Sequence, residues 1–206
     1  METLLSQGKV LPVMEEFHSI QGEGFHAGRA AWFIRIGGCD VGCSWCDVRE
    51  SWDASGFPPV PADEVIRRAA ACPAKAVVVT GGEPMLYNLG YLCEGLRNAG
   101  ISTFLETSGS EPVTGTWDWI CLSPKKDRPP LPEACGMADE LKVIIHDPSD
   151  FAWAEEQARR VRQACILFLQ PEWSRFREMV PQIVEYAKNH PEWRISLQIH
   201  KYMRIP

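Results

Sequence analysis

Three cysteines within eight residues are the clearest chemical motif of the chain: Cys39, Cys43 and Cys46, in the spacing C-x3-C-x2-C. Soft thiolates at this spacing suit an iron–sulfur cluster or a zinc ion. A closed zinc site or a ferredoxin cluster needs four protein ligands, so three thiolates leave one iron of a cubane open to a ligand. The spacing therefore favours a reactive [4Fe–4S] cluster. A structural zinc loop completed by His18, His26 or a remote cysteine is the alternative.

Polar groups follow several apolar runs at the point where each run ends. Thr80 to Pro84 (TGGEP) follows the apolar run 75–80, and ETSG, SPK and QP begin at Glu106, Ser123 and Gln170. Glycines let a ligand approach the backbone, and a carboxylate can hold an ammonium group. Each group alone is an ordinary cap or turn. Because functional groups collect at the carboxyl ends of parallel strands, together they predict one site.

Short apolar and β-branched runs predict the strands that position these groups, at 31–36, 75–80, 102–107, 119–125, 140–145, 165–170 and 194–199. Amphipathic stretches predict helices at 61–71, 88–99, 151–163 and 174–189. Alternating strands and helices indicate an α/β fold with a parallel sheet. There are fewer than eight units, so we expect a partial (βα) barrel reduced in helix number, in a single domain over residues 1–206. The Pro-rich segment 126–138 is predicted to be an irregular loop.

Charge and composition exclude other classes of protein. The chain has 21 Lys and Arg against 27 Asp and Glu, a formal charge of -6, which argues against non-specific nucleic-acid binding. We find no secretory signal and no apolar run of roughly 20 residues, so we expect a cytoplasmic protein without membrane contact. In that reducing compartment the eight cysteines are not expected to form disulfides. The five scattered ones are expected to be small buried hydrophobes: Cys72, Cys93, Cys121, Cys135 and Cys165.

The cysteine loop, with Trp45 before its last cysteine, resembles the signature of radical S-adenosylmethionine (SAM) enzymes, and TGGEP resembles the motif by which they bind the amino group of SAM. This resemblance implies a partial barrel of the radical SAM type. It also implies that SAM grips the open iron and is cleaved to methionine and a 5′-deoxyadenosyl radical. The SAM contacts it implies are Trp45, Cys46, Asp47, Gly82, Glu83, Glu106, Ser123, Pro124, Lys125 and Gln170.

The segment SIQGEG (19–24) and the final HKYMRIP (200–206), with the motifs above and ELK, resemble the 7-carboxy-7-deazaguanine synthase family over almost the whole chain. The resemblance implies ring contraction of 6-carboxy-5,6,7,8-tetrahydropterin with loss of ammonia, started by hydrogen abstraction from C6. A pterin has a guanidine-like edge that suits a carboxylate, and its own carboxylate suits an arginine. The substrate contacts it implies are the backbone of Ile20, Gln21 and Gly22, with Glu23, Arg35, Thr80, His200 and the carboxylate of Pro206.

One residue departs from the family pattern. Members can bind Mg²⁺ beside the substrate through a hydroxyl two residues after the third cysteine, where this chain has Val48, whose side chain offers no oxygen. We therefore expect weak or absent Mg²⁺ stimulation. The resemblance further implies a homodimer and an electron donor such as flavodoxin or ferredoxin. The alternatives are a glycyl-radical-enzyme activase, which would act on a partner protein, and a non-catalytic zinc or iron–sulfur module; SIQGEG and the final segment favour an enclosed small-molecule site.

Overall fold

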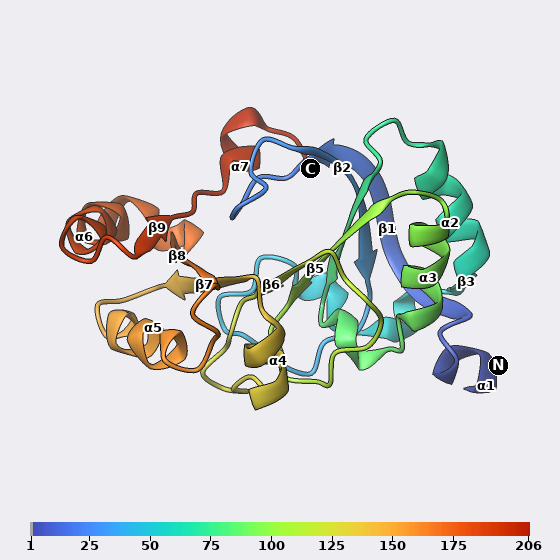
Figure 1. Cartoon of the computed structure of the whole chain (residues 1–206), viewed down its shortest axis with the longest axis horizontal. Coiled ribbons are helices and arrows are strands. Elements are labelled where there is room, and N and C mark those ends of the chain that lie inside the picture. Colours follow the sequence, from blue (N-terminus) through green and yellow to red (C-terminus); the bar gives the residue numbers. More distant parts are fainter. Residues whose placement is uncertain (1) are drawn as a thin grey trace.

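A nine-stranded sheet forms the centre of the protein (Figure 1). The structure is a computed structural model, and it describes residues 2–206. Its strands are β1 (Val10–Ile20), β2 (Ala30–Ile36), β3 (Pro59–Pro61), β4 (Ala76–Gly81), β5 (Ser102–Thr107), β6 (Trp119–Leu122), β7 (Glu140–Ile145), β8 (Ile166–Pro171) and β9 (Trp193–Ile195). Their order is β3-β1-β2-β4-β5-β6-β7-β8-β9. β1 runs antiparallel to β2 and β3, and the strands from β2 onward are parallel. The sheet is not closed, which confirms the predicted α/β partial barrel.

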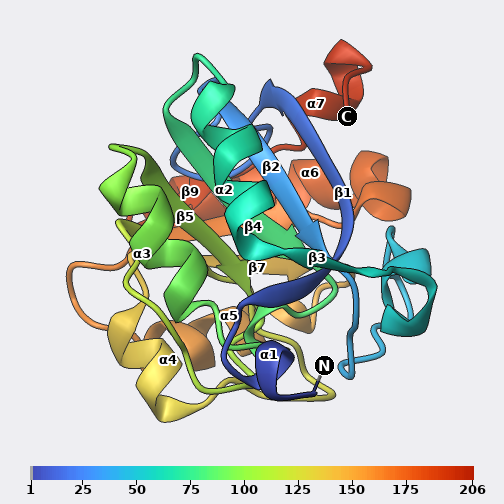
Figure 2. The same cartoon turned by 90° about the vertical axis from the view of Figure 1, so that its right-hand side faces the viewer.

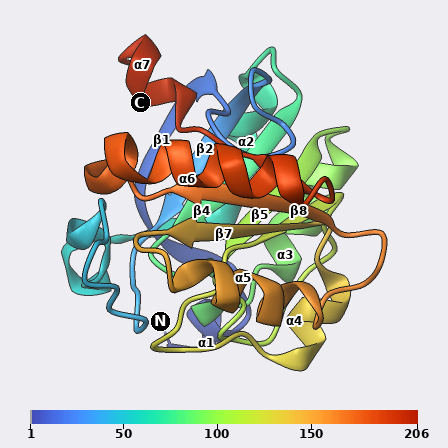
Figure 3. The same ribbon diagram turned by 90° about the vertical axis from the view of Figure 1, so that its left-hand side faces the viewer.

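The helices are α1 (Glu2–Ser6), α2 (Ala62–Ala71), α3 (Gly90–Asn98), α4 (Pro132–Met137), α5 (Asp150–Ala158), α6 (Phe176–Asn189) and α7 (Ile199–Met203). Short 3-10 turns span Arg49–Ser51, Ala54–Gly56, Pro84–Leu86 and Trp173–Arg175. Figure 2 shows α2 and α3 covering β2, β4 and β5, and Figure 3 shows α5 and α6 over β7 and β8. All four predicted helices are present. Among residues 2–206, no helix has both the length and the apolar character needed to cross a membrane.

Several sequence-based expectations need correction. The strand predicted over 119–125 is β6, which ends at Leu122, and the helix predicted over 151–163 is α5, which ends at Ala158. The segment 126–138, predicted as an irregular loop, contains α4, which begins at Pro132. Proline suits the first helical position because its missing N–H has no intrahelical partner there. The strand predicted over 194–199 is only β9, since Ser196 donates its backbone N–H to Leu169 and the chain then turns into α7. This early departure brings the end of the chain toward the site.

The alternation of side chains along the strands divides the core into two faces. Ile34, Val79 and Leu105 point outward and pack under α2 and α3, while the next cluster, with Leu141 and Leu169, lies under α5 and α6. The inner face carries Ala31, Phe33, Ala76, Val78 and Phe104. Two residues further along three of these strands, the same face carries Arg35, Thr80 and Glu106. Hence the inner face is apolar near the amino ends of the strands and polar near their carboxyl ends.

Candidate active site

A cavity of about 300 Å³ lies on the inner face of the sheet, and it brings together every site residue named from the sequence except Pro124. Its walls include the cysteine loop, the carboxyl ends of β4, β5, β6 and β8, the segment 20–23 that follows β1, and residues from the end of the chain. Segments about 180 positions apart therefore line one space: Gly22 accepts a hydrogen bond at its carbonyl from the N–H of Ile199, 2.9 Å away.

The cysteine loop and the TGGEP segment are packed directly against each other. Glu83 donates its backbone N–H to the carbonyl of Gly38 at 2.8 Å. A Cβ on Gly82 would lie 2.1 Å from that carbonyl oxygen and 2.7 Å from Cβ of Cys39. Glycine is required at position 82 because no side chain fits there. The two motifs that looked separate in the sequence thus form one wall of the cavity.

The Glu83 side chain is buried and fully hydrogen-bonded within the protein. Its carboxylate accepts from the N–H of Met85 at 3.0 Å, from Oγ1 of Thr107 at 2.6 Å, and from the N–H and Oγ of Ser108 at 2.8 and 2.6 Å. A carboxylate has about four acceptor positions. The carboxylate therefore connects the TGGEP turn to the end of β5, and its contact with SAM stays a prediction.

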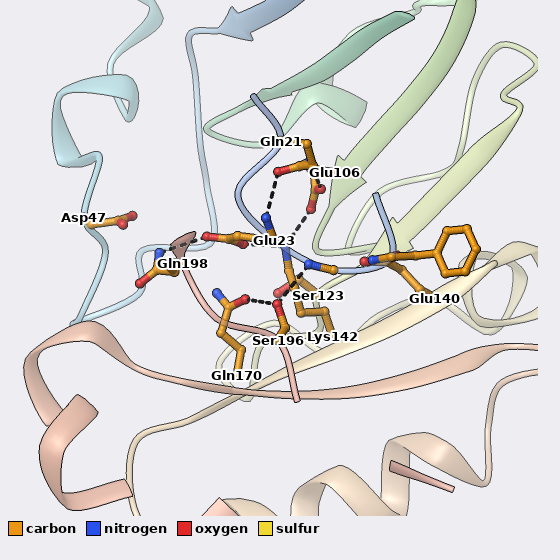
Figure 4. A network of polar contacts seen from close by, with 12 residues as sticks. Gln21, Glu23, Asp47, Glu106, Ser123, Glu140, Lys142, Gln170, Ser196 and Gln198 are labelled. Carbon is orange, nitrogen blue, oxygen red and sulfur yellow. Dashed lines mark hydrogen bonds and ion pairs between the residues drawn. The ribbon is translucent and has the colours of Figure 1, made fainter. Parts of the chain in front are cut away.

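A buried ion-pair network crosses the floor of the cavity (Figure 4). Nζ of Lys142, on β7, lies 2.6 Å from Oε2 of Glu23 and 2.9 Å from Oε2 of Glu106. Gln21 donates from Nε2 to Glu106 and accepts at Oε1 from the N–H of Glu23, both at 3.1 Å. Gln198 donates to Oε1 of Glu23 at 2.9 Å. The network holds the 21–24 segment between β5, β7 and the end of the chain.

Residues near the end of the chain complete the same wall. Ser196 accepts a hydrogen bond from the N–H of Gly24 and donates one to Gln170. The His200 ring lies over Gly22, where a Cβ would come within 2.1 Å of Nδ1, and burial lowers the pKa of this histidine. Pro206 lies beside β1, since its backbone oxygen accepts from Oγ of Ser19 at 2.8 Å.

Two cations lie on other walls of the cavity. Arg35 donates from Nε to Oε1 of Glu15 at 2.6 Å, and its guanidinium lies 5.9 Å from the centre of the Phe17 ring. Lys125 donates to Oγ of Ser123 at 2.8 Å and lies 5.7 Å from the centre of the Trp45 ring. Burial lowers the pKa of Lys125.

Similarity to known proteins identifies the family. Residues 33–121 match the Radical SAM superfamily. Over all 206 residues the chain is 54% identical to the 7-carboxy-7-deazaguanine synthase of Flavobacterium psychrophilum, covering 98% of that protein. It is 46% identical to the synthase of the same name from Synechocystis sp., covering 94% of this chain and 93% of that one.

The chain belongs to the 7-carboxy-7-deazaguanine synthase family. The fold agrees: the crystal structure of QueE from Escherichia coli superposes with a TM-score of 0.84 at 28% identity, over 95% of this chain and 97% of that one. As a radical SAM enzyme, a 7-carboxy-7-deazaguanine synthase uses a [4Fe–4S] cluster and SAM. This membership excludes the non-catalytic module and favours the synthase over the glycyl-radical activase.

The residues present fit both cofactors of the synthase family. Cys39, Cys43 and Cys46 are free and line the cavity, and burial raises the pKa of the Cys39 and Cys43 thiols. Such thiols lose their protons readily only to a bound cation. The Gly82 backbone, bare of a side chain, faces the loop that carries them. The five scattered cysteines are buried, and none of them lines the described part of the cavity.

Sequence reasoning overlooked several members of this site, chiefly Lys142, Ser196 and Gln198. The signal for Lys142 is its position in ELKVII, a run that is apolar apart from Glu140 at its start and this lysine. It shares the inner face with Glu140 and Ile144, by strand alternation. Ser196 and Gln198 have no sequence signal, because their contacts depend on how the chain leaves β9.

Proposed function

We propose that the protein converts 6-carboxy-5,6,7,8-tetrahydropterin to 7-carboxy-7-deazaguanine with release of ammonia, beginning with abstraction of hydrogen from C6 of the pterin. One observation carries the proposal: the cysteine triplet lines the same cavity as a carboxylate, Glu23, and a guanidinium, Arg35. These two groups are complementary to the two polar ends of the pterin. The name of the relatives, 7-carboxy-7-deazaguanine synthase, agrees with this product.

The chain's own residues bind and orient the substrate in this scheme. Glu23 accepts hydrogen bonds from the 2-amino group and N3, while Arg35 donates to the carboxylate at C6. Ile20, Gln21 and Gly22 contribute backbone groups, with Thr80, His200 and Pro206 completing the substrate shell. Phe33 and Val78 supply an apolar wall that keeps water from the reacting carbon.

The cofactors would have their own set of residues in the same cavity. Cys39, Cys43 and Cys46 would hold the cluster, and the SAM shell would comprise Trp45, Asp47, Gly82, Glu83, Glu106, Ser123, Pro124, Lys125 and Gln170 with Cys46. Glu83 would contribute to this shell through its main chain, because its carboxylate is fully hydrogen-bonded to the protein. When bound, the cluster and SAM supply the radical that abstracts the hydrogen. Lys125 can balance the charge of a carboxylate in the cavity.

The decisive experiment uses anaerobically purified, reconstituted and reduced protein with SAM and 6-carboxytetrahydropterin. We expect 7-carboxy-7-deazaguanine and ammonia in equal amounts. Cys43→Ala should lose iron and turnover, while Cys72→Ala, at a buried cysteine away from the cavity, should keep both. Protein that cleaves SAM but forms no deazaguanine would contradict the substrate. A colourless preparation containing zinc would contradict the cluster.

Three further features complete the proposal. We propose that the protein forms a homodimer. We also propose a small electron-transfer protein, such as flavodoxin or ferredoxin, as the reductant, because an enzyme of this superfamily needs an external electron. We propose a cytoplasmic location, since all eight cysteines are unpaired in the described chain and suit a reducing compartment. Light scattering after gel filtration tests the dimer, and reduction by each purified donor tests the reductant.

A further inference from the structure

Lys142 is a buried cation at the centre of the site, and the ELK motif that contains it came with no role for the lysine. Its side chain is 5% exposed, and its ammonium contacts the carboxylates of Glu23 and Glu106 at 2.6 and 2.9 Å (Figure 4). A buried lysine is costly unless it is paired. Glu106 stands on β5 and Glu23 in the segment after β1, so one ammonium connects two carboxylates from separate walls.

Glu23 keeps room for a ligand despite these contacts. Lys142 uses one acceptor position on Oε2 and Gln198 uses one on Oε1. A carboxylate has about four such positions, so each oxygen retains one. The Glu23 side chain is 18% exposed and lines the cavity. Two oxygens with one free position each match a pair of parallel N–H donors, such as the 2-amino and N3 groups of a 2-amino-4-oxopyrimidine ring.

From this arrangement we infer that Lys142 is a positioning residue that keeps Glu23 ionised and aimed, so that the site selects a 2-amino over a 2-oxo ring. The inference rests on the proposed function and deepens it. An ionised carboxylate only accepts hydrogen bonds, which suits two N–H donors and repels a 2-oxo oxygen. A protonated Glu23 would instead donate its O–H to that oxygen. Removing Lys142 therefore weakens the preference as well as the affinity.

Among the charged groups around Glu23, Lys142 is the one that keeps its carboxyl group ionised. Burial by itself would raise the pKa of Glu23, but the charge and hydrogen bond of Lys142, with the amide of Gln198, lower it to about 2. The other ionisable groups facing this pair are Glu106 on β5, Cys121 on β6, Glu140 on β7, Lys125 after β6 and His200 on α7. The carboxylates among them disfavour a further negative charge, and His200 has a pKa lowered by burial. Lys142 is the ammonium in direct contact with Glu23.

The first test measures the ionisation of the Glu23 carboxyl group and needs no enzyme activity. Carbon-13 NMR of glutamate-labelled protein follows Glu23, assigned with Glu23→Gln. In Lys142→Met we expect Glu23 to titrate above about pH 6, as buried carboxyls without a counter-charge do. Lys142→Arg and the control Lys126→Met, whose lysine pairs with Asp150 outside the cavity, should leave it acidic. If Lys142→Met does not fold, Lys142→Gln gives the same reading; Glu23 remaining ionised at pH 4 in either variant overturns the inference.

The second test measures selectivity with non-reacting probes, 7-carboxy-7-deazaguanine and its 2-oxo counterpart, by calorimetry at neutral pH. We expect the wild type and Lys142→Arg to prefer the 2-amino ring by roughly 10- to 100-fold, the worth of one bidentate pair. Lys142→Met should lose most of that preference. An unchanged preference in Lys142→Met overturns the inference. A wild type that binds neither probe overturns the proposed substrate, and the carboxyl titration still decides what Lys142 does.

Discussion

The backbone N–H and the hydroxyl of Ser108 lie 2.8 and 2.6 Å from one oxygen, Oε2, of the Glu83 carboxylate. The other oxygen accepts from Thr107 and Met85. This carboxylate therefore joins the turn after β4 to the end of β5, at the place where the cysteine loop also packs. The glutamate of TGGEP thus organises the cavity wall before any ligand binds.

Glu83→Gln should destabilise the protein by about 2 kcal/mol, because an amide nitrogen would face N–H donors and leave buried groups unpaired. The measurement is urea unfolding of the protein without its cofactors, monitored by circular dichroism. Glu94→Gln, at an exposed position on α3, is the matched control. Equal unfolding midpoints for the two variants would show that these hydrogen bonds contribute little.

The parallel strands and the edge of the sheet that carries the cavity could be predicted because both follow from local pattern, whereas β1 and β3 were not among the predicted strands. Runs such as KAVVVT are mostly apolar because helices cover one face of the strand and the other face belongs to the apolar inner layer that includes Val78, Phe33 and Phe104. The polar groups after them meet because parallel strands end at one edge. The helix α4 was missed because Pro129 and Pro130 precede it and Pro132 begins it, although Pro132 occupies a position where proline is tolerated.

The contacts between distant segments do not follow from local pattern, and only the family resemblance placed Gly22 and His200 in one site. Gly22 with His200, and Gly24 with Ser196, meet because β9 ends after three residues and the chain then crosses toward β1. No local pattern encodes that crossing. Lys142 is intermediate: its strand and face were predictable, but its two partners depend on the same long-range packing.

Glu23 should make the free energy of unfolding depend on pH in the acidic range. Its pKa falls from 4.5 to about 2 on folding, so its contribution is fully present above pH 4.5 and is lost as the pH falls toward 2. The full contribution is on the order of 3 kcal/mol, and roughly 1 kcal/mol of it is lost by about pH 3.5. Urea midpoints of the wild type and Glu23→Gln should therefore converge on acidification. A difference that is constant between neutral and acidic pH would exclude this linkage.

Arg35→Ala should impair turnover mainly through substrate binding. Arg35 lines the cavity, and its Nε contact with Glu15 fixes the guanidinium beside the Phe17 ring. Losing a charge-assisted hydrogen bond to the substrate carboxylate should raise KM for 6-carboxytetrahydropterin by about 10- to 100-fold, with a smaller change in kcat. Arg97→Ala, at an exposed position of α3, is the control. An unchanged apparent affinity for the pterin would refute this role.

Mg²⁺ should stimulate this enzyme weakly or not at all. Val48 lines the cavity two residues after Cys46 and offers no side-chain oxygen, and its own carbonyl accepts hydrogen bonds from Ser51. The neighbouring Asp47 is engaged by Lys201, whose Nζ lies 3.0 Å from Oδ2. Val48→Thr adds the missing hydroxyl, so turnover of that variant should rise saturably with Mg²⁺, whereas Val48→Ala should behave like the wild type. A strong, saturable response of the wild type would mean that the ion is held by other oxygens of the site.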